Sequence, residues 1–201
     1  MTQPIRMIEL FAGIGAQASA MERLGIPHER VAVAEINERA YKVYVALHGP
    51  TPNLGDVTKI EHLPECDLLT YSSPCQDISI AGHKRGLAQG SGTRSATLWG
   101  VGRLLKDMKD NGRKLPEVLL MENVDSILHK HAIADFQQWI RLLDSLGYTN
   151  SYSVLNAKDH GIPQNRKRMF MVSTQTYGKF VFPEARPLQY VLKDFLDKDV
   201  D

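Results

Sequence analysis

The chain has 201 residues, of which 43% are hydrophobic and 23% are charged. This length fits one ordinary domain, and this balance is typical of a globular chain that buries a core, which excludes wholesale disorder. No apolar stretch approaches the roughly 18 residues of a membrane span, and none follows the N-terminus, so we expect neither a membrane anchor nor a secretory signal.

Charge alone does not indicate a partner. Lys and Arg number 24 against 23 for Asp and Glu, a net charge of +1, whereas dedicated nucleic-acid binders are usually strongly basic. Any nucleic-acid contact must therefore come from a local patch, such as residues 166–168. The two cysteines cannot form a disulfide scaffold, which favours a reducing, cytoplasmic setting. The seven histidines show no metal-ligand spacing, so we expect no metal site.

Short apolar runs alternate with amphipathic stretches along the chain. The runs predict strands at 7–12, 31–34, 67–71 and 118–121, another strand before Gly55, and two late antiparallel strands at 148–155 and 169–173. Helices are expected at 16–24, at 99–108, at 136–146, and from an Asn37 N-cap towards His48. This alternation predicts an α/β fold, doubly wound around a mostly parallel sheet.

Residues 72–96 form the longest stretch without a strand or helix pattern. The stretch contains several glycines and charges, and it follows the predicted strand that ends at Tyr71. A loop of about 25 residues inside a compact domain is uncommon and usually functional. Because ligands of α/β sheets gather beyond the carboxyl ends of strands, we expect chemistry here.

Three segments together describe an adenosine-binding edge. The turn Phe11-Ala12-Gly13-Ile14-Gly15 follows the first strand, and glycines there let a ligand approach the backbone. Glu35 lies 22 residues after Gly13 at the end of the next strand, where a carboxylate can accept hydrogen bonds from ribose hydroxyls, and Asp56 follows a third strand. Ala18 replaces the third glycine of the dinucleotide fingerprint, so a tightly packed turn and a nicotinamide oxidoreductase both stay open.

Cys75, Glu122, Arg166 and Arg168 are the candidate reactive side chains. Cys75 lies at the mouth of the long loop, where a thiolate can act as a nucleophile, whereas Cys66 starts an apolar strand and is interpreted as a core residue. Glu122 ends a strand, and the two arginines alternate so that they share one face. The alternatives are a carboxylate that caps a helix and a solvated basic turn.

Taken in chain order, these segments resemble the cytosine-5 DNA methyltransferase family over essentially the whole chain. The resemblance rests on six motifs: Phe11-Ala12-Gly13-Ile14-Gly15, Glu35-Ile36-Asn37, Gly55-Asp56-Val57, Pro74-Cys75-Gln76, Glu122-Asn123-Val124 and Gln164-Asn165-Arg166-Lys167-Arg168. The stretch from 76 to 99 looks most like restriction-system or phage members. The resemblance implies a Rossmann-like sheet of the S-adenosylmethionine-dependent methyltransferase type.

The resemblance also implies roles for individual residues. Cys75 would add to a flipped cytosine in DNA, Glu122 would hold ring nitrogen 3, and Arg166 and Arg168 would steady the base while carbon 5 is methylated. S-adenosylmethionine would be held by residues of the first four motifs, namely Phe11, Ala12, Gly13, Ile14, Gly15, Glu35, Ile36, Asp56, Val57 and Pro74.

The sequence departs from the family at Ser73 and Ala16, where phenylalanine and glycine are common. The family continues with a target-recognition domain and two further motifs, whereas this sequence ends at Asp201. We therefore expect a catalytic domain at 1–180, a tail at 181–201 leading to an absent recognition region, and a need for that region or a second chain that carries it. The host would be a bacterial or phage-infected cell. The alternatives are a silent fragment that binds cofactor or DNA, and a transfer RNA cytosine-5 methyltransferase.

Overall fold

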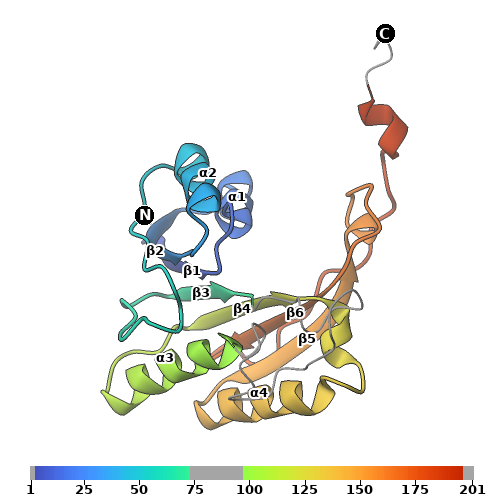
Figure 1. Ribbon diagram of the computed structural model, residues 1–201. Helices are drawn as coiled ribbons and strands as arrows, with labels where there is room; N and C mark the ends of the chain where they lie inside the picture. Colours follow the sequence, from blue (N-terminus) through green and yellow to red (C-terminus); the bar gives the residue numbers. More distant parts are fainter. Residues whose placement is uncertain (1–2, 73–96, 197–201) are drawn as a thin grey trace.

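The computed structural model describes residues 3–72 and 97–196, which build one six-stranded sheet with helices on both faces (Figure 1). The strands are β1 (Ile5–Leu10), β2 (His28–Ala34), β3 (Leu68–Tyr71), β4 (Val118–Asn123), β5 (Thr149–Asn156) and β6 (Lys167–Thr174). The helices are α1 (Ala16–Arg23), α2 (Glu38–His48), α3 (Leu98–Asp110) and α4 (Ile133–Ser145), with short 3-10 turns η2 (Asp125–Leu128), η3 (Ala157–Asp159) and η4 (Leu192–Phe195).

The sheet has the order β2-β1-β3-β4-β6-β5. The first four strands in this order are parallel, and β6 runs antiparallel between β4 and β5. The predicted doubly wound, mostly parallel sheet is therefore confirmed, as is the antiparallel pairing of the two late strands. The register pairs Leu10 with Tyr71 and Tyr71 with Met121, so the carboxyl ends of β1, β3 and β4 meet at one edge.

The strand predicted before Gly55 is wrong. In its place, Asn53 forms a single isolated parallel bridge to Val33 at the edge of the sheet. Pro52 has no N–H to donate to a ladder, although its carbonyl accepts a hydrogen bond from the N–H of Val33 at 2.8 Å. The segment therefore follows β2 for one bridge without becoming a strand.

The two faces of the sheet are covered to different extents. Helices α3 and α4 pack over one face and form the larger core with alternate strand residues such as Leu119 and Met121. On the opposite face α1 and α2 lie over β1 and β2, where Met7, Val33 and Tyr44 form a smaller core (Figure 1). No helix within the described ranges covers the β4-β6-β5 half of that second face, and Leu120 there is only partly buried.

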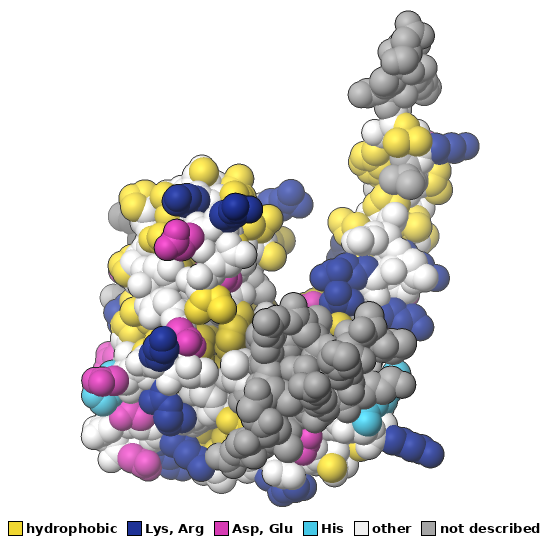
Figure 2. All heavy atoms as spheres, in the orientation of Figure 1, with side chains coloured by type: hydrophobic (Ala, Val, Ile, Leu, Met, Phe, Trp, Pro, Cys, Tyr) yellow, Lys and Arg dark blue, Asp and Glu magenta, His cyan; other side chains and the backbone are white. Residues whose placement is uncertain are grey.

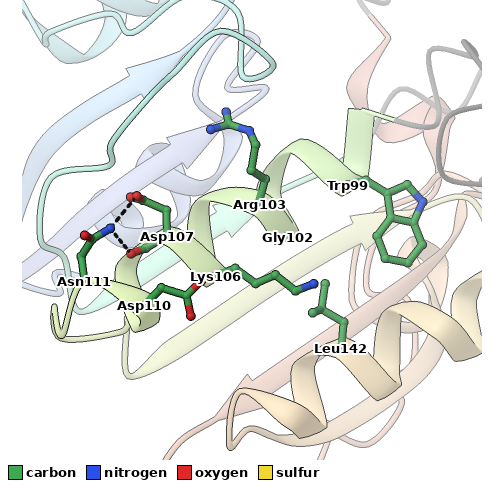
Figure 3. Close-up of a pocket in the computed structure, with 8 residues that line it drawn as sticks. All are labelled: Trp99, Gly102, Arg103, Lys106, Asp107, Asp110, Asn111 and Leu142. Atoms are coloured by element: carbon green, nitrogen blue, oxygen red, sulfur yellow. Dashed lines mark hydrogen bonds between the residues drawn. The ribbon is translucent and has the colours of Figure 1, made fainter.

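Helices α3 and α4 approach closely at Gly102, which faces Leu142 across the groove between them (Figure 3). A Cβ at position 102 would lie 2.6 Å from Cδ2 of Leu142 and 3.0 Å from the ring of the buried Trp139. A Cβ at Gly100, in the first turn of α3, would make an ordinary contact at 3.4 Å with Val57. The absence of a side chain is thus needed at Gly102 and not at Gly100.

This difference predicts opposite effects of two alanine substitutions. Gly100→Ala should raise the free energy of unfolding by up to about 1 kcal/mol, because alanine is the better helix former. Gly102→Ala should lower it by about 1 kcal/mol, because Leu142 and Trp139 must move and this outweighs the helix gain. Urea denaturation with matched m-values measures both changes. Equal stabilisation by the two substitutions would contradict the close packing at Gly102.

Candidate active site

The glycine turn after β1 has an unusual backbone. Phe11, Gly13 and Gly15 all have positive φ angles, of 58°, 57° and 85°, and the N–H of Gly15 donates to the carbonyl of Ala12 at 2.9 Å. Phe11 adopts this conformation without being glycine, which stores backbone strain. A Cβ on Gly13 would meet nothing within 4 Å, so this residue borders open space. The turn therefore has open space beside Gly13.

Glu35 lies against this turn, as its position at the end of β2 predicted. Its carboxylate accepts hydrogen bonds from the N–H of Gly13 at 2.8 Å and from the N–H of Asn37 at 2.7 Å. Ile36, the next residue, is 75% exposed. An ionised carboxylate has further lone pairs, so Glu35 can still accept a hydrogen bond from a ligand hydroxyl.

Asn53 connects the loops that carry the two acidic residues, and the sequence did not single it out. Its side-chain oxygen accepts from the N–H groups of Glu35 and Gly55, both at 3.0 Å, and its side-chain nitrogen donates to the carbonyl of Glu35 at 2.9 Å. The amide therefore holds the backbone of Glu35 and the loop of Asp56 together. Nothing in the local pattern marks this role, because the two loops become neighbours only in the folded sheet.

Asp56 and Val57 differ in their accessibility. The Asp56 carboxylate accepts hydrogen bonds from the hydroxyl of Thr58 at 2.8 Å and from its N–H at 2.9 Å, and the hydroxyl contact is the main cause that lowers the pKa of Asp56 below its usual value. Val57 is 3% exposed and packs in the larger core. The predicted contact of Val57 with a cofactor would therefore have to come from its backbone.

A cavity of about 640 Å³ separates the glycine turn from the half of the sheet that has no helix on this face. It joins residues of the turn and α1 with residues of β4, β5, β6 and the loop between the last two. The lining residues are Phe11, Ala12, Gly13, Ile14, Ala16, Gln17, Ala20, Ser72, Leu120, Glu122, Leu155, Ala157, His160, Arg166, Arg168 and Phe170. The fold thus brings two groups of predicted site residues, far apart in sequence, to one cavity. Glu35 does not line it but contacts Gly13, which does.

Glu122 and Arg168 form an ion pair in the wall of this cavity. The Nε of Arg168 lies 2.8 Å from Oε1 of Glu122, and the two side chains are 23% and 27% exposed. Arg168 also donates from Nη1 to the carbonyl of Lys167 at 2.8 Å. A pair this exposed contributes little to stability. Its main consequence is to orient a carboxylate and a guanidinium side by side at a ligand-sized opening.

Asn156 sets the start of β6, and the sequence did not reveal it. This buried side chain accepts from the N–H of Arg166 at 3.0 Å and of Lys158 at 3.4 Å, and donates to the side chain of Asn165 at 2.8 Å. It thereby closes the loop from 157 to 166, which carries His160 and Arg166 to the cavity. His160 is a further lining residue that the sequence analysis did not select.

Cys75 and Pro74 lie outside the described residues. Ser72, the last described residue before them, lines the cavity. Cys66 is 3% exposed, and burial raises the pKa of its thiol to about 12. It is therefore a protonated core residue at neutral pH, which agrees with the structural role predicted for it.

A second hollow, of about 570 Å³, runs along α3 on the opposite face of the sheet (Figure 3). Two of its charged residues, Arg103 and Asp107, are engaged in contacts that hold the fold. Arg103 donates to the carbonyls of Val57 and Ile60, and the side-chain amide of Asn111 donates to Asp107 at 2.8 and 2.9 Å. This hollow has none of the predicted site residues, so the cavity at the glycine turn is the candidate active site.

The following two statements apply to residues 3–72 and 97–196. No group of three or more His, Cys, Asp or Glu side chains in these ranges could hold a metal ion. In the same part of the chain, no helix combines the length and apolar character needed to cross a membrane.

The family profile for C-5 cytosine-specific DNA methylase matches residues 5–199, which include both groups of cavity residues. The chain belongs to this family. Its members are S-adenosylmethionine-dependent methyltransferases. Because the family uses S-adenosylmethionine, membership in it argues against interpreting the glycine turn as a nicotinamide site. Ala18, where a nicotinamide site would have glycine, is fully buried and donates its N–H to Glu9 at 3.2 Å.

Similar proteins align with nearly all of the chain. It is 32% identical to the type II methyltransferase M2.ScrFI of Lactococcus lactis subsp. cremoris, over 98% of the chain and 68% of that protein. It is 36% identical to the orphan methyltransferase M.SssI of Spiroplasma monobiae, over 99% of the chain and 66% of that protein. The solved structure of the Entamoeba histolytica methyltransferase EhMeth superimposes with a TM-score of 0.77 at 21% identity, over the whole chain and 62% of that structure. The chain therefore spans about two thirds of these proteins.

The role of Asn156 predicts a local effect of its removal. Asn156→Ala should lower the free energy of unfolding by about 1 kcal/mol, because two partly buried N–H groups lose their acceptor. Hydrogen exchange at the N–H of Arg166 should accelerate more than exchange in β1. Asn150→Ala is the matched control on the same strand, since Asn150 donates to Asp144 and not to this loop. Equal exchange at Arg166 in the two variants would contradict the positioning role of Asn156.

Proposed function

We propose that this chain transfers the methyl group of S-adenosylmethionine to carbon 5 of cytosine in DNA. The supporting observation is the single cavity that joins the glycine turn to the Glu122–Arg168 pair. The methyl donor and the base must bind in one site. This cavity is lined by the glycine turn on one side and by the Glu122–Arg168 pair on the other. We propose residues 1–180 as the catalytic domain and residues 181–201 as the segment leading to a recognition region.

The residues at the turn fit the cofactor. The open space beside Gly13 admits a ligand next to the backbone, and the cavity volume is in the usual range for small-molecule sites. When bound, S-adenosylmethionine supplies an electrophilic methyl group. The Glu35 carboxylate would accept hydrogen bonds from the ribose hydroxyls, while Phe11 and Ile14 would cover apolar parts of the ligand. Asp56 would contact the cofactor from the loop that Asn53 holds beside Glu35.

The proposed reactive residues act on different atoms of the cytosine ring. The thiolate of Cys75 would add to carbon 6, which makes carbon 5 nucleophilic towards the methyl group. Glu122 would hydrogen-bond ring nitrogen 3, and Arg168 and Arg166 would stabilise the charge that develops on the ring. After methyl transfer a base would remove the proton at carbon 5, and the bond between carbon 6 and Cys75 would break to release the thiolate.

An exposed basic patch lies next to the cavity. It consists of Lys158, Arg166, Lys167 and Arg186, and the backbone N–H of Arg186 donates to the carbonyl of Asp159 beside the cavity loop. Figure 2 shows Lys and Arg side chains gathered at the base of the projecting C-terminal segment. Such a patch can neutralise phosphates without reading sequence. We propose that base-specific recognition requires a further segment or a second chain, and that the enzyme acts in the bacterial cytoplasm.

Trapping with 5-fluorocytosine tests the covalent step, because fluorine at carbon 5 blocks the final elimination. Placing this base in a mismatched pair of the duplex oligonucleotide lowers the free energy needed to flip the base out. With S-adenosylmethionine present, the wild-type chain and Cys66→Ala should form an adduct that survives denaturing electrophoresis, and Cys75→Ser should form none. Trapping through Cys66, or preferential trapping of an RNA oligonucleotide, would refute the proposal as stated.

A substitution at the turn tests the cofactor assignment. Glu35→Gln should weaken S-adenosylmethionine binding by about tenfold to a hundredfold, because a charged hydrogen bond to the ribose is worth about 1.5–3 kcal/mol. Glu38→Gln changes the net charge equally on the exposed start of α2 and should leave the affinity unchanged. Isothermal titration calorimetry gives both values. A preference of the wild-type chain for NAD over S-adenosylmethionine would contradict the assignment.

A further inference from the structure

The segment at 52–54 runs beside the end of β2 for a single residue pair, Val33 and Asn53. The pairing has the form of a parallel ladder: the N–H of Val33 donates to the carbonyl of residue 52 at 2.8 Å, and its carbonyl accepts from the N–H of residue 54 at 2.7 Å. If the ladder continued in this form, the backbone of Glu35 would bond to residues 54 and 56 in the same way.

The side chain of Asn53 takes the place of this second backbone partner. Its amide oxygen accepts from the N–H of Glu35 at 3.0 Å, and its amide nitrogen donates to the carbonyl of Glu35 at 2.9 Å. One side chain thus bonds both backbone groups of Glu35. The chain after Asn53 does not have to follow β2 any further, and it turns away at Gly55, whose φ angle is 72°.

The same amide oxygen also fixes the loop that leaves the sheet. It accepts from the N–H of Gly55 at 3.0 Å, which is the hydrogen bond of an Asx turn. An amide oxygen has two lone pairs, and the N–H groups of Glu35 and Gly55 use both. The opposite orientation of the amide would direct its N–H groups at two donors, so the network determines the orientation. Asn53 therefore sets both the end of β2 and the start of the loop that carries Asp56.

Glu35 links this arrangement to the glycine turn. Its carboxylate accepts from the N–H of Gly13 at 2.8 Å and from the N–H of Asn37, the N-cap of α2, at 2.7 Å. The side chain of Glu35 is thus held by the turn and by α2, and its backbone is held by Asn53. Asn53 itself is exposed, so water can satisfy its partners at a small cost in stability. Water cannot fix the distance between the two loops.

We infer that Asn53 is the positioning residue of the adenosine-binding edge, acting through Glu35 and through the loop of Asp56. This inference rests on the proposed cofactor function of that edge. Without the amide, the end of β2 and the loop lose their fixed spacing, and a ligand must order them when it binds. This ordering lowers the affinity. Removal of the amide should therefore affect ligand binding far more than it affects folding.

Amide hydrogen exchange in the chain without ligand tests the contacts themselves. Asn53→Ala removes the acceptor of two N–H groups, so exchange at Glu35 and Gly55 should be faster than in the wild-type chain. Asn53→Asp keeps an acceptor at the same place and lacks only the donor, so it should accelerate this exchange less. Unchanged exchange at both positions in Asn53→Ala would overturn the inference.

Calorimetry with S-adenosylhomocysteine then tests the consequence for binding. This demethylated form of the donor keeps the adenosine and has no net charge, so a new charge at position 53 affects it little. Asn53→Ala should bind it about tenfold more weakly than wild type, which corresponds to about one hydrogen bond, and Asn53→Asp should recover part of the loss. Asn111→Ala is the matched control and should bind as wild type, because Asn111 is also exposed but donates to Asp107 at the end of α3.

A double-mutant cycle with Glu35→Gln separates positioning from a general loss of structure. Because Asn53 acts partly through Glu35, Asn53→Ala should reduce the affinity by a smaller factor in the Glu35→Gln chain than in the wild-type chain. The midpoint of urea denaturation should change little in Asn53→Ala. An equal reduction of affinity in both backgrounds would contradict action through Glu35.

Failure of the proposed function has a different signature. A wild-type chain that binds neither S-adenosylmethionine nor S-adenosylhomocysteine would refute the cofactor assignment and the inference that rests on it. A wild-type chain that binds both ligands, together with an Asn53→Ala variant that binds them equally well, would refute the positioning role of Asn53 alone.

Discussion

The parallel pairing of β1, β3 and β4 brings Leu10, Tyr71 and Met121 into one row across the sheet. The chain leaves the sheet just beyond this row at the glycine turn after β1 and at Ser72 after β3, while Glu122 follows the row inside β4 and still pairs with β6. A shift of one residue in either pairing would turn Glu122 into the core under α3 and α4. The position of the whole candidate site depends on this register, which the alternating burial of β4 enforces.

The uneven covering of the sheet turns this edge into a site. Helices α3 and α4 bury one face of β4, while Leu120 and Phe170 on the other face border the cavity. Partly exposed apolar side chains on a sheet carry a cost in water that a bound ligand removes. The polar groups around them are held in place by neighbours: Glu122 by Arg168, Glu35 by Gly13, and the start of β6 by Asn156. The site is thus apolar at its floor and polar at its rim.

Patterns local in sequence predicted most of the fold. The N-cap at Asn37 is confirmed, since its side chain accepts hydrogen bonds from the N–H groups of Arg39 and Ala40. The sequence also placed Glu35 directly after β2, whereas Glu122, expected just after a strand, lies inside β4 one residue before its end. The strand expected before Gly55 does not form, because Pro52 has no N–H to donate to a neighbouring strand. The segment makes only the single bridge between Asn53 and Val33.

Residues that act through distant backbone groups could not be predicted in this way. Asn53 and Asn156 bond backbone groups across a strand edge or a loop, and His48 reaches the turn across 34 residues. Their side-chain types are common in any surface loop or helix end, so only the folded arrangement distinguishes them. Residues with a known motif spacing can be recognised in a sequence. The residues that hold such a motif in position cannot, because they have no spacing of their own.

We propose that the cavity between the glycine turn and the β4-β6-β5 half of the sheet binds S-adenosylmethionine. Methyl NMR of the full chain tests it directly, because labelled isoleucine and leucine side chains lie on both faces of the sheet. On titration with S-adenosylmethionine, the methyl signals of Ile14, Leu120 and Leu155 should shift in a saturable way. Those of Leu104, Ile127 and Leu143, buried in the larger core under α3 and α4, should stay in place. Saturable shifts confined to the second group, or no shifts in the first, would contradict the account.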